Sequence, residues 1–320
     1  MAVSSSAAVD SFRHEALLYS NHSEFLAGTV PFIREGLSAG EAILVVEPAD
    51  KISLLRAVLG TDSEGVHFAD MGAVGANPAL IIPAWQEFTT TNGLQGRRMR
   101  GIGEPIFSAR RPAELIECQR HEALLNVAFD KGLPWWLLCP YDISVLSPAV
   151  INEARRSHPY VRDGSTSLTN GERGIGNWAA PYEAPLPPPP HERHILPITL
   201  DRLHAARDLV GAEAARGGLP RDRVADLVAA ANEVATNSVR HGGEPSVLRV
   251  WRSDDALVCE ISDRGHIERP LADREKPGAD LKASRGLWLA NHLCDLVQIQ
   301  SSPGATTVRM HMWLNQTPTS

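Results

Sequence analysis

A proline-rich stretch over residues 181–190, P-Y-E-A-P-L-P-P-P-P, limits the possible folds more than any other feature of the sequence. Proline lacks a backbone N–H donor and fixes φ, so this stretch is incompatible with a helix or a central strand and predicts a stiff polyproline II spacer. The residues before it, 157–177, are rich in Gly, Ser and Asn and predict an extended tail or loop. We therefore expect one domain over residues 1–163, a linker over 164–193 and a second domain over 194–320.

The composition is that of a globular protein. The 320 residues suffice for two domains of ordinary size, and 43% of them are hydrophobic. No apolar run approaches the roughly 20 residues of a membrane span, and the N-terminus has neither the basic start nor the apolar core of an export signal. We therefore expect a soluble, cytoplasmic protein that does not bind a membrane.

Cysteine spacing and net charge exclude two further classes. The four cysteines are far apart and include no C-x-x-C pair, which argues against a disulfide framework. The net charge is −7, and neither half of the chain has the basic excess that binding to a phosphate backbone requires. Direct binding to nucleic acid is not expected.

Short apolar runs alternate with helical patterns before the proline-rich stretch. Strands are predicted at 42–46, 66–69, 98–102 and 135–139, with helices near 50–59, 78–92 and 112–131. Nearly continuous apolar strands that alternate with helices are typical of a mainly parallel sheet covered on both faces. The first domain is therefore predicted to be α/β.

The order of the elements changes after the proline-rich stretch. Helices over 199–216 and 222–241 come first, followed by strands at 247–252 and 256–262, a helix at 286–295 and strands at 296–301 and 306–314. Helices followed by a mostly antiparallel sheet predict an α+β two-layer sandwich.

One face of the helix predicted over 222–241 carries Glu233, Asn237 and His241, which recur every fourth residue beside an apolar stripe. A carboxylate can accept a proton from an attacking hydroxyl, and an amide oxygen one turn away can bind Mg²⁺ that holds phosphates. On this helix alone, an ordinary solvated face explains the same pattern.

Two glycine-containing motifs follow in the same domain. A D-R-G motif with Asp263 and Gly265 comes after a strand, where a carboxylate can accept a hydrogen bond from the amine of adenine and a glycine lets the backbone approach the ring. An R-G-L motif, Arg285, Gly286 and Leu287, opens a helix, and free amides at a helix N-terminus suit a phosphate group. Each motif alone is equally compatible with an ordinary turn.

Together, the order and spacing of these motifs resemble the GHKL superfamily of gyrase, histidine-kinase and chaperone ATPases. E-V-A-T-N-S-V-R-H-G resembles its N box, D-R-G its G1 box, R-G-L-W-L-A-N its G2 box and G-A-T-T-V-R-M its closing strand. The resemblance spans about residues 195–315 and implies a Bergerat-fold domain that binds ATP and Mg²⁺.

The resemblance implies a role for each matching residue. Glu233 would be the catalytic base, Asn237 the Mg²⁺ ligand and Asp263 the residue that reads adenine. The nucleotide would also contact His241, Gly265, Arg285, Gly286, Leu287, and Thr306 or Thr307. One position departs from the family pattern D-x-G-x-G: Ile267 occupies the place of the second glycine, where its side chain could narrow the lid over the site.

The two helices of this domain narrow the resemblance further. The pattern L-D-R-L-H-A-A-R-D-L-V, followed by G-L-P-R-D-R-V-A-D-L-V and the N box, is similar to the anti-sigma factor serine/threonine kinases. That similarity implies a homodimer that regulates transcription by binding a sigma factor in one state. In the other state it would phosphorylate an anti-anti-sigma partner, with Glu233 activating the partner's hydroxyl.

Two alternatives stay open. A sensor histidine kinase needs a phosphoacceptor histidine on a two-helix hairpin, whereas a single helix separates the linker from the N box. His204 on that helix, and His191 and His194 beside the linker, are more readily explained as surface residues. The altered G1 box would also fit a non-catalytic module that binds a sigma factor in a nucleotide-dependent way.

The first domain resembles the MEDS family of sensory domains over about residues 12–160. The matching segments include H-E-A-L-L-Y-S-N-H-S-E-F-L, P-F-I-R-E-G-L-S-A-G-E-A-I-L-V-V, R-G-I-G-E-P-I-F and E-C-Q-R-H-E-A-L-L-N. The family's architecture implies a recombinase-like nucleotide-binding α/β fold. No G-x-x-x-x-G-K-[ST] motif is present, so no ATPase activity is expected in this half.

Two features of the first domain are candidates for sensing. Cys118, His121 and Glu122 share one face of a predicted helix, and Cys139 ends a nearby strand, which suggests either a metal or redox site or, as the few ligand types favour, a partly buried helix. The segment 101–105, G-I-G-E-P, follows a strand, where α/β sheets usually bind ligands. It either lines a pocket for a small molecule or forms a plain turn.

Overall fold

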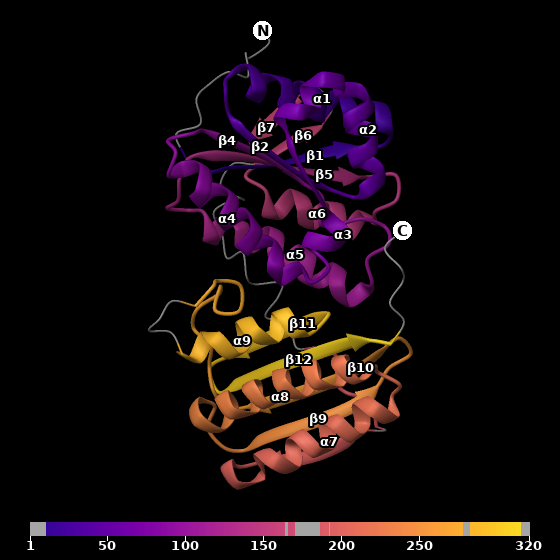
Figure 1. Cartoon of the computed structure of the whole chain (residues 1–320), viewed down its shortest axis with the longest axis vertical. Helices are drawn as coiled ribbons and strands as arrows, with labels where there is room; N and C mark the ends of the chain where they lie inside the picture. Colours follow the sequence, from indigo (N-terminus) through magenta and orange to yellow (C-terminus); the bar gives the residue numbers. More distant parts are fainter. Residues whose placement is uncertain (1–10, 164–165, 170–185, 192, 278–281, 315–320) are drawn as a thin grey trace. The chain divides into compact units, whose positions relative to one another are not determined.

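The computed structural model describes residues 11–163, 166–169, 186–191, 193–277 and 282–314 (Figure 1). The chain divides into two compact units, Met1–Trp178 and Ala179–Ser320, each with its own sheet. No helix among the described residues is long and apolar enough to cross a membrane. The predicted proline-rich spacer lies partly outside the described residues, which resume at residue 186.

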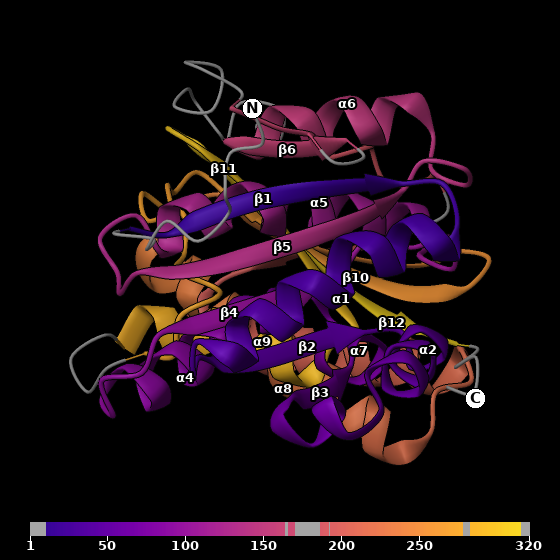
Figure 2. The ribbon, with the colours of Figure 1, turned by 90° about the horizontal axis from the view of Figure 1, so that it is seen from above.

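The first unit is built on a seven-stranded sheet with the order β3-β2-β4-β5-β1-β6-β7. Its strands are β1 (Arg13–Tyr19), β2 (Ala42–Glu47), β3 (His67–Asp70), β4 (Met99–Gly103), β5 (Trp135–Asp142), β6 (Tyr160–Asp163) and β7 (Thr166–Thr169). All neighbouring strands pair in parallel except β6 and β7, which are antiparallel. Figure 2 shows β6, β1, β5, β4 and β2 side by side in this order. The predicted, mainly parallel α/β sheet is confirmed.

Helices cover both faces of this sheet. They are α1 (His22–Ser38), α2 (Ala49–Leu59), α3 (Met71–Val74), α4 (Ile81–Gly93), α5 (Pro112–Ala128) and α6 (Pro148–Ser157), with 3₁₀ turns η1 (Gly60–Gly65) and η2 (Pro78–Leu80). In Figure 1, α1 and α2 lie on one face and α4, α5 and α6 on the other. Phe25 and Ile33 of α1 share a buried core with Leu17, Val45 and Ile102 of the strands. Burial of these apolar side chains holds α1 on the sheet.

Two parts of this unit differ from the prediction. β1 and α1 are absent from the predicted elements, because His14 and Glu15 interrupt the apolar pattern of β1 and Pro31 lies inside α1. Residues 157–177, predicted to be a tail or loop, contain β6 and β7, and β6 pairs with β1. β7 also lies within the predicted linker, so the compact first unit continues past the predicted boundary at residue 163.

The second unit has a five-stranded antiparallel sheet with the order β11-β12-β10-β9-β8. Its elements are β8 (His194–Ile198), η5 (Leu200–Arg202), α7 (Leu203–Arg216), α8 (Arg221–His241), β9 (Ser246–Arg252), β10 (Ala256–Asp263), α9 (Lys282–Leu293), β11 (Leu296–Ser302) and β12 (Ala305–Trp313). The core between helices and sheet contains Leu227 and Ala231 of α8 and alternate residues of β10, namely Leu257, Cys259 and Ile261. The predicted α+β two-layer sandwich is confirmed.

Two features of this sheet were not expected. β8 is absent from the predicted strands and pairs with β9. The N–H of Leu186 donates to Oε1 of Gln300 (3.1 Å), and the Arg309 guanidinium donates to the carbonyl oxygen of Pro187 (2.7 Å). The described end of the proline-rich stretch therefore contacts the sheet. All four cysteines are buried and free.

Candidate nucleotide-binding site

A pocket of about 230 Å³ lies at the end of α8. Its walls come from the C-terminal half of α8, the loop after β10, the middle of α9 and the start of β12. The predicted site residues that line it are Asn237, His241, Asp263, Gly265, Leu287 and Thr306. The other lining residues are Val234, Ser238, Gly242, His266, Ile267, Glu268, Arg269, Ala272 and Val308. The fold thus brings the separate motifs of the sequence to one cavity.

Helix α8 positions the N-box residues. Its apolar stripe, which includes Leu227, Ala231 and Ala235, is buried in the core. Glu233 and Asn237 are half-buried on an adjacent face, where α9 packs against α8. They therefore lie beside a neighbouring helix and not on a freely solvated face.

Gly286, the fifth residue of α9, lets this helix approach these two side chains. A Cβ atom at Gly286 would lie 2.5 Å from Nδ2 of Asn237 and 3.5 Å from Cβ of Glu233. Any larger residue would displace the Asn237 amide, so glycine at this position leaves that amide in place. Glu233 and Gly286 do not line the pocket, whereas Asn237, one helical turn after Glu233, does.

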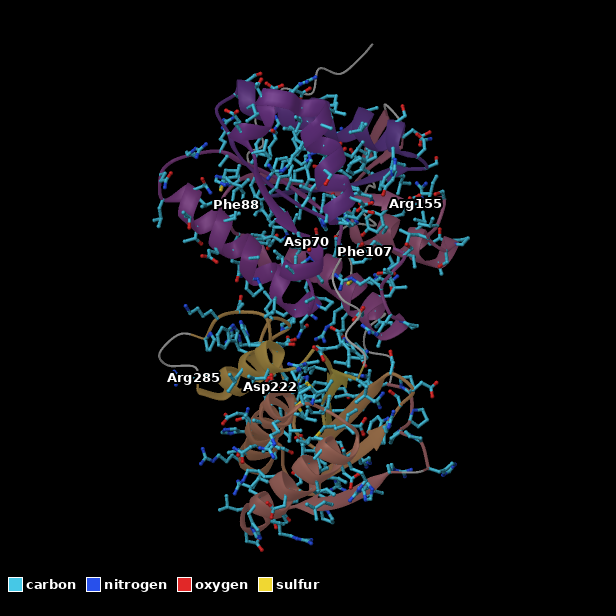
Figure 3. All side chains as sticks on the ribbon, turned by 45° about the vertical axis from the view of Figure 1, so that its right-hand side comes forward. Asp70, Phe88, Phe107, Arg155, Asp222 and Arg285 are labelled. Carbon is cyan, nitrogen blue, oxygen red and sulfur yellow. The ribbon has the colours of Figure 1, made fainter. Side chains whose placement is uncertain are left out.

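The other two residues of the R-G-L motif differ in exposure. The helix begins at Lys282, so the R-G-L motif lies one turn inside α9 and does not open it as predicted. Arg285 is exposed and does not line the pocket (Figure 3). Leu287 is buried and forms part of the pocket wall. The residues just before α9, 278–281, lie outside the described part of the chain. Within the motif, Leu287 therefore contributes apolar surface to the pocket wall, and Gly286 leaves room for the Asn237 side chain.

The D-R-G turn holds Asp263 in another wall of the pocket. The N–H of Gly265 donates to Oδ1 of Asp263 (2.7 Å), which fixes the carboxylate. A Cβ atom at Gly265 would lie 2.8 Å from Cα of Gly242, and a Cβ atom at Gly242 would collide with the Asp263 carboxylate. Two glycines therefore let the end of α8 and the turn meet around one carboxylate. Gly242 is absent from the predicted site, although the H-G-G sequence that ends the helix is a signal for it.

Thr306 and Ser301 support this turn from the sheet. They are paired across β11 and β12, and their hydroxyl oxygens lie 2.7 Å apart. Thr306 donates to the carbonyl oxygen of Gly265 (3.1 Å), and Ser301 accepts the N–H of Ile267 (2.8 Å). Thr307 does not line the pocket, because successive residues of a strand face opposite sides. No motif in the sequence points to Ser301.

Ile267, at the position of the second family glycine, lines the pocket and packs against the core of the domain. With Val234, Leu287 and Val308 it makes an apolar wall. An apolar slot with one fixed carboxylate matches a flat ring that carries one amine, as adenine does. The donor set and the glycine-lined approach therefore fit an adenine nucleotide.

Known families match both units. Residues 13–159 match the MEDS family, described as the MEthanogen/methylotroph, DcmR Sensory domain. Residues 196–312 match the family described as the Histidine kinase-like ATPase domain. The chain joins a MEDS domain to a histidine kinase-like ATPase domain. ATP is accordingly the nucleotide that the ATPase-domain assignment implies.

Similarity to individual proteins is more limited. A solved structure with similarity to this chain is the crystal structure of the RsbU and RsbW domains of Rv1364c from Mycobacterium tuberculosis. It is 21% identical, with a TM-score of 0.30. The match covers 38% of this chain and 32% of that chain. No curated protein matches the chain.

In the MEDS domain, the residues predicted to form a metal or redox site are only partly brought together. Glu122 of α5 and Cys139 of β5 meet, and two histidines from other elements join them. Cys118 and His121 do not belong to this group. Burial raises the pKa of the Cys118 thiol to about 12, so that this thiol stays protonated and unreactive.

The G-I-G-E-P segment of the MEDS domain ends in a buried polar cluster. Glu104 follows β4 and accepts a hydrogen bond from the hydroxyl of Tyr19 (2.9 Å), which ends β1. Lys51 of α2 forms an ion pair with Glu104 and also contacts the Tyr19 hydroxyl. Glu47 ends β2, and burial, followed by the charge of Glu104, raises its pKa well above the ordinary range. These groups share the carboxyl ends of parallel strands, where such sheets bind ligands.

Proposed function

We propose that the ATPase domain is a protein serine/threonine kinase that binds Mg-ATP and phosphorylates an anti-anti-sigma partner, in the manner of the anti-sigma factor kinases. The observation that carries the proposal is that Asn237 and Asp263 line one pocket, with Glu233 one helical turn before Asn237 on α8. A carboxylate and an amide one helical turn apart at such a pocket are groups that suit phosphoryl transfer to a hydroxyl.

Each residue has a separate task. Asp263, held by Gly265, accepts a hydrogen bond from the adenine amine, while the apolar wall excludes water from the ring. The side-chain oxygen of Asn237 is a ligand that suits Mg²⁺. Glu233 accepts the proton of the partner's hydroxyl as its oxygen attacks. When bound, Mg-ATP supplies the γ-phosphoryl group and neutralises the charge that develops during transfer.

The first test is ATP affinity by calorimetry, with and without Mg²⁺, on the full chain and on Asp263→Asn. We expect the substitution to weaken binding about 10- to 100-fold, because an amide group can present a donor where the adenine amine needs an acceptor. Asp208→Asn, which changes an exposed carboxylate of α7, is the matched control and should leave the affinity unchanged. Equal affinity of the wild type and Asp263→Asn would remove the site assignment.

The second test is phosphoryl transfer from radiolabelled ATP to candidate anti-anti-sigma proteins. Phosphoserine and phosphothreonine are stable in acid, so acid-stable label on the partner is the expected result. Acid-labile label on this chain itself would contradict the proposal and support a histidine kinase. His204, which is exposed on α7, would then be the first residue to substitute.

Ile267 favours a second candidate function. Its side chain lines the pocket where the family pattern has glycine, so the alternative is a domain that binds ATP without transferring phosphate. Such a domain would bind a sigma factor in a nucleotide-dependent way. ATP binding without transfer to any partner, together with sigma-factor capture that changes on addition of ATP, would favour this alternative.

The MEDS domain is the proposed input of the protein. We infer that a small molecule binds near Glu104, because its cluster with Tyr19 and Lys51 lies at the carboxyl ends of the strands. A thermal-shift screen of small metabolites on the wild type, repeated on Glu104→Gln, tests the inference. Ligands that stabilise only the wild type are expected, and ligands that stabilise both proteins equally would contradict it.

A further inference from the structure

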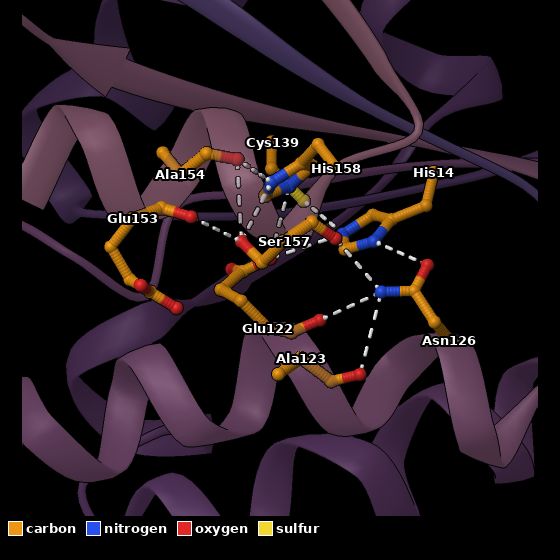
Figure 4. Close-up of polar contacts among 9 residues, drawn as sticks. All are labelled: His14, Glu122, Ala123, Asn126, Cys139, Glu153, Ala154, Ser157 and His158. Carbon is orange, nitrogen blue, oxygen red and sulfur yellow. Dashed lines mark hydrogen bonds and ion pairs between the residues drawn. The ribbon is translucent and has the colours of Figure 1, made fainter. Parts of the chain in front are cut away.

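Four side chains form a closed cluster inside the MEDS domain (Figure 4). They are His14 of β1, Glu122 of α5, Cys139 of β5 and His158, which directly follows α6. None of these residues is more than 1% exposed. One ligand atom from each lies within 4.8 Å of the other three. We call this group the His-Glu-Cys cluster.

The sheet positions two members of the His-Glu-Cys cluster. β1 and β5 are parallel neighbours, and Ala16 pairs with Cys139. His14 lies two residues before Ala16 and therefore shares its face of the sheet. Glu122 reaches this face from α5, and His158 reaches it from the end of α6. Four separate elements thus converge on one point.

The distances within the cluster are close to those between ligands of one metal ion. Oε2 of Glu122 lies 3.1 Å from Nε2 of His14 and 3.2 Å from Nε2 of His158. Sγ of Cys139 lies 3.4 Å from Nε2 of His14. Metal–ligand distances of about 2.0–2.3 Å in a tetrahedral Zn²⁺ site separate the ligand atoms by roughly 3.3–3.8 Å. Ion binding therefore requires only small movements of these side chains.

Both imidazoles are oriented by hydrogen bonds outside the cluster. Nδ1 of His14 donates to Oδ1 of Asn126 (3.2 Å), whose Nδ2 donates to the carbonyl oxygen of Ser157 (2.9 Å). Nδ1 of His158 donates to the carbonyl oxygen of Ala154 (2.8 Å). With the protons on Nδ1, the Nε2 lone pairs of both rings point into the cluster. Metal-bound histidines are held in the same way.

The charges in the cluster favour a cation. Both Nε2 atoms approach the Glu122 carboxylate, and its other oxygen, Oε1, has no hydrogen-bond partner among the described residues. A buried carboxylate that lacks full compensation is costly. A divalent cation would be balanced by this carboxylate and the Cys139 thiolate.

We propose that the His-Glu-Cys cluster is a Zn²⁺ site. Two imidazole nitrogens, one thiolate and one carboxylate oxygen supply the four mixed donors that Zn²⁺ accepts in tetrahedral sites. Binding releases the thiol proton of Cys139 to solvent. Burial on all sides leaves no open coordination position, so the ion has a structural or regulatory role and not a catalytic one. It would tie the first strand of the domain to the segment that enters β6.

The metal content of the full chain tests the proposal. The protein is purified with Zn²⁺, dialysed against a weak chelator and analysed for zinc by mass spectrometry. We expect about one Zn²⁺ per chain in the wild type and less than about a tenth of that in Cys139→Ala. Cys118→Ala, which removes a buried cysteine outside the cluster, is the matched control and should keep its zinc. Wild-type protein without stoichiometric zinc, or full zinc in Cys139→Ala, would overturn the proposal.

Cobalt gives a measurement that does not depend on the folding of a variant. Co²⁺ in the wild-type site should show the intense visible absorption of a tetrahedral ion and an ultraviolet charge-transfer band from the thiolate. Added Zn²⁺ should abolish both, and Cys118→Ala should show both. The thiolate band also separates this site from any ion bound with ATP. Weak octahedral absorption without that band would contradict the proposal.

Discussion

The nucleotide pocket of the ATPase domain and the His-Glu-Cys cluster of the MEDS domain are built in opposite ways. The pocket depends on Gly242, Gly265 and Gly286, which let backbone segments approach one another, while Asp263 and Asn237 stay half-buried. The cluster depends on side chains that reach into a closed core. An open pocket can exchange its ligand while the domain stays folded, whereas a ligand enclosed on all sides becomes part of the fold.

The largest expected effect is loss of the proposed base at the open site. Glu233→Gln keeps the shape of the side chain beside Gly286 but cannot accept a proton. ATP affinity should stay within about twofold, and phosphoryl transfer should slow by roughly 10²- to 10⁴-fold. Single-turnover transfer to the partner measures the effect. Transfer at the wild-type rate would assign the base elsewhere, and His241→Gln would be the next variant, since His241 lines the pocket.

Removal of the metal should affect only the closed site. A strong Zn²⁺ chelator is expected to lower the melting temperature of the MEDS domain by on the order of 5–10 °C, because a ligand at 100 times its Kd stabilises the folded state by about 2.7 kcal/mol. Scanning calorimetry measures this shift, and Cys139→Ala should not respond to the chelator. ATP affinity should stay constant. A fall in ATP affinity on chelation would break the comparison, because the two sites would then be coupled.

A pH titration tests whether burial of a titratable side chain lowers the stability of the ATPase domain as the pH falls. His311 is buried beside Gln298 (3.0 Å), and burial, followed by the charge of Arg309, lowers its pKa to about 3. The pKa of histidine in the unfolded chain is about 6.5. At a pH between these two pKa values, the unfolded chain binds a proton at His311 and the folded chain does not. The free energy of unfolding therefore falls as the pH drops. Between pH 7 and pH 5, His311→Gln should lose about 2 kcal/mol less than the wild type in urea unfolding. Equal losses would show that His311 is not the group responsible.

The smallest expected effect concerns the wall of the open pocket. Ile267→Gly restores the family pattern D-x-G-x-G but removes apolar surface that lines the pocket. ATP affinity should fall about three- to tenfold, or roughly 0.7–1.4 kcal/mol, in calorimetric titration. Ile267→Val keeps most of the apolar surface and is the matched control. Tighter binding by the glycine variant would mean that the isoleucine obstructs the pocket.

The two sites also differ in how far the sequence predicts them. The motifs that supply the pocket could be recognised because each is local: Glu233 and Asn237 are one helical turn apart, and Asp263 lies two residues from Gly265. The α/β and α+β folds could be predicted for the same reason, since apolar periodicity is a local property. Ser301 could not be predicted, because its role depends on strand pairing with Thr306.

The His-Glu-Cys cluster could be predicted only in part. The helical spacing of Cys118, His121 and Glu122 indicates the correct helix, yet only Glu122 belongs to the cluster. His14 lies 125 residues from Cys139, so no local spacing connects them. His14 is polar but buried, so it interrupts the apolar pattern from which β1 would be predicted. For this reason neither the strand nor the cluster could be predicted from the sequence around His14.

Short edge strands limit how readily each sheet can pair with another chain. In the MEDS domain the edge strands β3 and β7 have four residues each, against eight in the central β5. In the ATPase domain the edge strand β8 contains Pro197, which cannot donate a hydrogen bond to a neighbouring strand. These edges offer little backbone with which a second chain could pair. The edges at β3, β7 and β8 are thereby protected against pairing with another chain, whereas the edge strand β11 has seven residues and no proline.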